Sequence, residues 1–176
     1  MITQRTDYVF ANMSPNGLTP AFTYGMVSIA IVVMGHMIFE YLSAFIKGTP
    51  ITISFVIESL AGGVLAFPLF LFVILVFGVL QHIGLMCLAR LRHPLNATLR
   101  ALIYGYSTAN LICLIPIVGN LLGVIYTIRL VGLGTAQIQG TDTWRGVVVS
   151  IGTLLTLALA VFAVVGILVR LGIDFS

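Results

Sequence analysis

Apolar residues fall in long runs along this chain, and short stretches with polar residues, prolines and glycines separate the runs. A run of about 20 apolar residues can cross a hydrocarbon layer about 30 Å thick as a helix. The pattern therefore predicts an all-α fold, a polytopic membrane helix bundle with five transmembrane helices. We expect them at about residues 21–46, 64–89, 99–115, 119–136 and 147–171.

The stretches outside these runs are expected to lie at the membrane surface. Residues 1–20 mix charged and aromatic side chains and are predicted to form a short interfacial segment, before one five-helix domain over residues 21–176. Residues 51–63 are expected to form a loop or short interfacial piece that carries Glu58. Pro68 then falls close to the first turn of the second helix, where its missing N–H is tolerated.

Composition supports the membrane class. Hydrophobic residues make up 60% of the chain and charged residues 7%, whereas soluble domains carry about 25% charged residues. The mean hydropathy of +1.17 likewise excludes a soluble protein. The 8 Lys plus Arg residues form no basic run, so we expect no nucleic acid partner.

Positive charge is unevenly distributed between the two ends of the predicted helices. Cytoplasmic loops of membrane proteins carry an excess of Lys and Arg. We therefore predict a cytoplasmic N-terminus and a C-terminus outside. Arg90, Arg92 and Arg100 are candidates for docking lipid headgroups or a partner. The predicted cytoplasmic side holds Arg5, Arg90, Arg92, Arg100 and Arg145, and the other side holds Lys47 and Arg170.

A few polar residues fall within the apolar runs. His36, Glu40, Ser43 and Lys47 are spaced by four, three and four residues, so they share one face of the first helix and should contact protein or water. His36 with Glu40 is a candidate for interhelical hydrogen bonding or for the proton relay of a transporter. Arg129 lies deep in the fourth helix, either as a ligand or ion site or as a side chain that snorkels or bonds carbonyls.

A short uncharged connection joins the third and fourth helices, which we expect to be antiparallel neighbours. Pro116 and Gly119 form a predicted helix-packing hinge at this connection. Gly119 and Gly123 are four residues apart, which gives the fourth helix a face of small residues where another backbone can approach closely.

Motifs for catalysis, metals and cofactors are missing from the sequence. It contains no nucleophile elbow, Walker loop or HExxH, and its 5 acidic residues show no paired-carboxylate pattern. Cys87 and Cys113 lie in apolar runs without metal-ligand spacing to histidines. We therefore expect no catalytic residue, no metal site and no cofactor, and a protein that is not an enzyme.

Three segments carry a resemblance to a known family: residues 104–107 (YGYS), residues 115–119 (IPIVG) and the run from Ile125 to Arg145. In order and spacing the chain resembles the Yip domain family of small integral membrane proteins, and its N-terminal segment is similar to that of bacterial members. Residues 92–94 (RHP) replace a glycine-rich stretch of that family. The long cytosolic N-terminal region of the eukaryotic members, which bind Ypt and Rab GTPases, has no counterpart here, so the resemblance does not favour GTPase binding.

These features favour a non-enzymatic membrane scaffold or adaptor of Yip-like type, which acts through helix packing and a basic cytoplasmic face. Its expected partners are membrane lipids and either a membrane protein or further copies of itself. The alternatives are a small transporter or lipid-translocating protein, and an accessory subunit of a larger membrane complex. The short loops favour a bacterial plasma membrane over an endomembrane such as the ER or Golgi.

Overall fold

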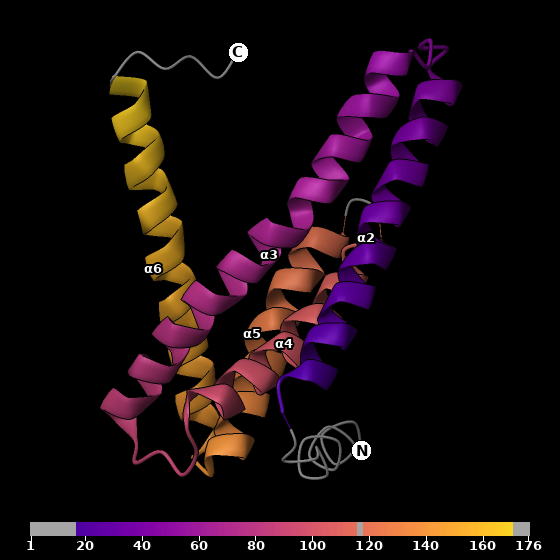
Figure 1. Ribbon diagram of the computed structural model, residues 1–176. Helices are drawn as coiled ribbons and strands as arrows, with labels where there is room; N and C mark the ends of the chain where they lie inside the picture. Colours follow the sequence, from indigo (N-terminus) through magenta and orange to yellow (C-terminus); the bar gives the residue numbers. More distant parts are fainter. Residues whose placement is uncertain (1–16, 116–117, 171–176) are drawn as a thin grey trace.

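A computed structural model describes residues 17–115 and 118–170, and this part of the chain forms five α-helices. The prediction of an all-α fold with five helices is confirmed. The segment expected at residues 1–20 and the hinge residue Pro116 lie largely or wholly outside the described residues. Figure 1 shows the helices α2 (Thr19–Ile46), α3 (Ile53–Leu88), α4 (Leu95–Ile112), α5 (Gly119–Gln139) and α6 (Thr143–Arg170).

Four of the described helices, α2, α3, α5 and α6, are long and apolar enough to cross a membrane. By length and composition, the chain is therefore a multi-span helical membrane protein. The remaining helix, α4, has 18 residues, or about 27 Å at 1.5 Å per residue. Half of its residues are buried inside the protein, so neighbouring parts of the protein cover much of α4.

The loop expected at residues 51–63 is wrong, because α3 runs unbroken through most of this range. Thr52 caps the helix, since its hydroxyl accepts a hydrogen bond from the Phe55 N–H at 3.3 Å. Pro68 consequently lies inside α3 and not near its first turn. A proline inside a helix removes one backbone hydrogen bond and bends the helix, and α3 changes direction partway along in Figure 1.

The other helix boundaries differ from the predicted ones by a few residues. The helix α2 begins at Thr19, two residues before the expected start, because Pro20 is tolerated in its first turn. Directly after Pro94, α4 begins four residues early. Gly140 ends α5 with a left-handed φ of 63°, a conformation that glycine adopts without a steric penalty.

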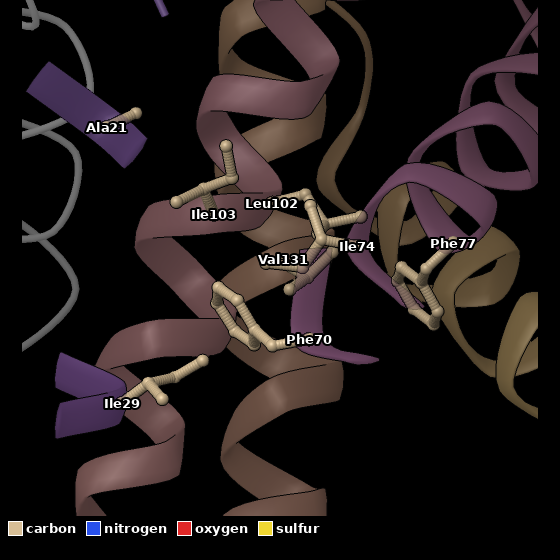
Figure 2. Close-up of a cluster of buried hydrophobic side chains, with 8 residues drawn as sticks. All are labelled: Ala21, Ile29, Phe70, Ile74, Phe77, Leu102, Ile103 and Val131. Carbon is tan, nitrogen blue, oxygen red and sulfur yellow. The ribbon is translucent and has the colours of Figure 1, made fainter. Parts of the chain in front are cut away.

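The helix α4 packs against α2, α3 and α5 and forms the centre of the bundle. Leu102 and Ile103 on α4 are completely buried. Around them lies the main hydrophobic cluster, to which four helices contribute, and Figure 2 shows its side chains. The cluster consists of Ala21, Ile29, Phe70, Ile74, Phe77, Leu102, Ile103 and Val131.

The hairpin of α4 and α5 is shorter than the helices around it and ends about half way along α2 (Figure 1). Leu114 at its tip contacts Gly35, which lies about 24 Å from Thr19 along α2 at 1.5 Å per residue. Backbone hydrogen bonds continue through the tip, where the N–H groups of Cys113, Leu114 and Ile115 each donate to the carbonyl three residues earlier. In the described part of the tip, these N–H groups are therefore satisfied locally.

The two ends of the bundle differ in packing, and we name them for what they contain. The arginine-rich end holds the α3–α4 turn with Arg90 and Arg92, the α5–α6 turn and the start of α2. The open end lies beyond the hairpin tip, where α2 and α3 stay paired and α6 diverges from them (Figure 1).

Candidate functional site

A groove of about 450 Å³ lies between α2 and α3 at the open end. His36 and Glu40 line it from α2, and Glu58 and Ser59 line it from α3. The polar face predicted for α2 thus turns toward a neighbouring helix and not only toward lipid. The remaining lining residues are apolar or small: Val32, Val33, Met37, Phe55, Gly62, Gly63 and Ala66.

The antiparallel pairing of α2 and α3 brings these polar residues together. Glu40 lies six residues before the end of α2, and Ser59 lies six residues after the start of α3. Residues at equal distances from the connecting turn face each other, and Ser59 Oγ donates a hydrogen bond to Glu40 Oε2 at 3.2 Å. This contact depends on Ser59 being helical, which the expected loop at residues 51–63 did not allow.

His36 bonds to the backbone of its own helix. Its Nδ1 lies 3.0 Å from the carbonyl oxygen of Val32. Because a carbonyl oxygen only accepts hydrogen bonds, Nδ1 carries the proton, and in the neutral ring Nε2 is left as an acceptor. The groove is therefore lined by the carboxyl groups of Glu40 and Glu58, which accept hydrogen bonds, and by His36 beside them.

A second, smaller cavity of about 230 Å³ continues the groove toward the middle of the bundle. The two cavities share Val32, Val33 and Ala66 as walls. Lower down, the wall is apolar, with Ile29, Leu69, Phe70 and Val73, and the two polar residues Tyr106 and Asn110 come from α4. The larger groove is lined by α2 and α3 alone, because the α4–α5 hairpin ends about half way along α2.

Arg129 is predicted to lie deep in the fourth helix. Among the described residues, it is not one of those that line the groove or the smaller cavity. Its side chain is exposed on α5, on the same outward face as Leu122, Ile125 and Tyr126. At ten residues from each end of α5, it lies about 15 Å from both. The structure therefore separates Arg129 from Glu40, its nearest acid by predicted depth.

The three arginines proposed for docking lie at the arginine-rich end, but in different settings. Arg90 and Arg92 are exposed in the α3–α4 turn, and Arg100 is half-buried on α4. Arg92 lies directly over Gly140, where an added Cβ would come within 2.6 Å of the Arg92 side chain. The α3–α4 turn therefore packs against the α5–α6 turn.

The glycines predicted at the hinge face α4 closely. A Cβ added at Gly119 would lie 2.6 Å from the carbonyl oxygen of Ile112, and one at Gly123 would lie 2.5 Å from Cys113 Sγ. Both glycines are buried. A bulkier residue at Gly119 has no room unless the backbone of the hairpin moves, and one at Gly123 displaces the Cys113 side chain.

Sequence reasoning missed a buried polar cluster at the arginine-rich end. Gln81 on α3 is completely buried, and its Nε2 donates to Ser150 Oγ at 3.0 Å and lies 3.3 Å from Thr135 Oγ1. Thr153 Oγ1 donates to Gln81 Oε1 at 3.3 Å. One glutamine thus ties α3 to both α5 and α6.

A second glutamine makes a similar connection nearby. Gln139 Nε2 donates to Thr98 Oγ1 at 2.9 Å, and its Oε1 accepts from the His93 N–H at 2.9 Å. His82 Nδ1 lies 2.8 Å from the same Thr98 hydroxyl. The signal that points to Gln81 is an uncharged amide inside an apolar run, because such a group must find a partner within the bundle. Gln139 lies beyond the predicted end of its run at residue 136, so no such signal marks it.

Comparisons of the chain with protein-family models, with curated proteins and with solved structures find no match.

Proposed function

We propose that the chain is a non-enzymatic membrane scaffold or subunit that binds another membrane protein, or a second copy of itself, through the outward face of α5. The observation that carries this proposal is the exposed Arg129 midway along α5, beside the exposed apolar side chains of Ile125 and Tyr126. An arginine that faces lipid costs up to about 2.5–3.5 kcal/mol on insertion scales, the value at the centre of the bilayer. Acceptor groups on a partner helix would reduce this cost, whereas snorkelling would do so without a partner.

Cross-linking in native membranes separates these two possibilities. A photo-reactive residue at Ile125, on the face of Arg129, should yield defined protein adducts, and one at Ile83 on α3 should yield few. The two positions are matched, since both are 51% exposed. Arg129→Leu should remove the Ile125 adducts and Arg129→Lys should retain part of them. Adducts that are unaffected by Arg129→Leu would support snorkelling and contradict the proposal.

The family resemblance supports the same proposal. Within the YGYS segment, Gly105 lies at the close approach of α4 to α5, where an added Cβ would sit 3.0 Å from the Val131 nitrogen. A motif used for helix packing suits a scaffold of Yip-like type better than an enzyme. We place the protein in a bacterial plasma membrane on the same grounds, and we do not propose a GTPase as its partner.

For the orientation, we propose that the arginine-rich end is cytoplasmic and that Arg90, Arg92 and Arg100 bind anionic headgroups there. Asn96→Cys should then react with a membrane-impermeant maleimide only from the cytoplasm. Thr49→Cys, in the turn at the open end, should react only from the other side. The reverse labelling pattern contradicts this orientation.

Transport is the second candidate function, and the groove between α2 and α3 favours it. The groove places His36, Glu40 and Glu58 in one cavity. Proton-linked transport predicts that protein in liposomes dissipates an imposed pH gradient and that Glu40→Gln stops it. Intact gradients with wild-type protein exclude this role.

A further inference from the structure

We infer that the groove between α2 and α3 binds a phospholipid with a primary-amine headgroup, taken from the leaflet at the open end. The headgroup lies at Glu40 and Glu58, and the acyl chains descend along the apolar wall toward α4. This inference is independent of the proposed scaffold role, since a bound lipid requires neither a protein partner nor transport.

The depth of the groove matches one leaflet. Along α2, the groove and its lower cavity extend from Glu40 to Ile29. These residues are about 16 Å apart at 1.5 Å per residue, close to half of a hydrocarbon layer about 30 Å thick. If α2 enters the hydrocarbon near Thr19, Glu40 lies about 31 Å further along, at the opposite boundary. The polar end of the groove therefore coincides with the headgroup level.

The lining changes from polar to apolar in the direction that a lipid requires. Glu40, Glu58 and Ser59 lie toward the open end, and Ile29, Leu69 and Val73 lie deeper. At about 450 and 230 Å³, the two cavities together are in the size range of sites for small molecules. An inorganic ion would use only the polar end, whereas an amphiphile fills both parts.

The hydrogen-bonding character of the polar end selects the headgroup. The carboxylates of Glu40 and Glu58 are acceptors, and Ser59 already donates its proton to Glu40. A primary ammonium offers three N–H donors, whereas a quaternary ammonium offers none. An anionic headgroup without an amine would be repelled by the two carboxylates.

In a phospholipid the phosphate lies between the amine and the glycerol that carries the acyl chains. Phosphatidylethanolamine combines a primary amine, which Glu40 and Glu58 can bind, with two acyl chains, which the apolar wall below them can contact.

Native mass spectrometry of the protein in nanodiscs tests the inference. The discs contain equal amounts of phosphatidylethanolamine, phosphatidylcholine and phosphatidylglycerol, and the retained lipid is identified after disc removal. Wild-type protein should retain phosphatidylethanolamine preferentially. The double variant Glu40→Gln with Glu58→Gln should lose this preference by about fivefold, the size expected of an exposed ion pair, while still retaining lipid.

A second variant tests occupancy of the groove. Gly62 lines the groove, and an added Cβ there meets no atom within 4 Å, so Gly62→Leu fills the cavity without a clash in the protein. It should abolish retention of lipid. Gly152→Leu on α6 is the matched control, because its added Cβ is equally free and it lies outside the groove. This variant should retain lipid like the wild type.

Two results would overturn the inference. Retention of the three lipids in equal amounts by wild-type protein would mean that the groove does not select the headgroup. Equal retention by the Gly62→Leu and Gly152→Leu variants would show that the bound lipid lies elsewhere. A thermal unfolding curve for each variant confirms that the compared proteins are folded.

Discussion

The two ends of this bundle use different means to hold helices together. At the arginine-rich end, backbones approach at glycines, and completely buried amides join α3 to α6 and α5 to α4. At the open end, α6 diverges, and side chains such as Phe162 (75% exposed) and Phe45 (76% exposed) face outward. Burial of apolar area gains little in lipid, so helices associate through close packing and hydrogen bonds. The end that has both is closed, and the end with few of either is open to lipid.

The largest loss of stability is expected at the contact between α5 and α6. A Cβ added at Gly146 would collide with the Gly132 carbonyl oxygen and lie 2.9 Å from the Ala136 Cβ. Gly146→Leu should therefore cost about 3 kcal/mol, the upper part of the range for overpacking. We expect a lower midpoint of thermal unfolding in detergent.

The same substitution six residues later provides the control. A Cβ at Gly152 meets nothing within 4 Å, so Gly152→Leu should unfold at the wild-type temperature. Equal midpoints for the two variants would mean that the close approach of α5 and α6 does not stabilise the bundle.

A larger side chain in the hairpin of α4 and α5 should destabilise the bundle less. Gly123→Leu places a side chain against Cys113 Sγ, which can shift more easily than a backbone carbonyl can. We expect a loss of about 1 to 2 kcal/mol in the free energy of unfolding. Val124→Leu, at a position that is 53% exposed, should change stability little. Unfolding midpoints of both variants measure the difference, and wild-type stability for Gly123→Leu is the contradicting result.

Removing a side-chain hydrogen bond should lower the free energy of unfolding by a smaller amount, and the loss should differ between the two ends. Gln81→Leu removes the amide that Ser150 and Thr153 bond, which should cost about 1 kcal/mol, within the range measured for interhelical bonds in membranes. Ser59→Ala at the open end removes the bond to Glu40, which is exposed, and should cost less. Denaturation in a mixed detergent series compares them. A larger loss for Ser59→Ala would reverse the comparison between the two ends.

The smallest effect on stability is expected at the hairpin tip, where the informative measurement is water access. Ile115→Cys introduces a thiol into a tip of uncharged apolar residues that lies level with the middle of α2. Because we expect the tip to remain in hydrocarbon, a water-soluble maleimide should label it from neither side until detergent is added. Thr49→Cys, in the turn beyond the tip, should be labelled in intact membranes. Similar labelling at both positions would place the tip at the membrane surface.

Helices and their order could be predicted from the sequence, since an apolar run of sufficient length forms a helix in a membrane whatever its neighbours are. The error at residues 51–63 has a local cause. Gly62 and Gly63 suggest a break when helix propensity is counted, and Glu58 interrupts the apolar run. The cap at Thr52 and the pairing with α2 nevertheless keep the segment helical. Propensity is a weak prior that such contacts override.

The candidate site, like the fold, could be predicted only in part. The spacing of His36 and Glu40 already placed them on one face of a helix, because helical periodicity is a local property. Only the tertiary structure decided that Glu58 and Ser59 meet that face, that Arg129 lies apart from it and that Gln81 joins three helices. These arrangements depend on how far each helix extends and on the short α4–α5 hairpin that leaves the groove unfilled. Such relations between distant segments arise from packing, which a single stretch of sequence does not encode.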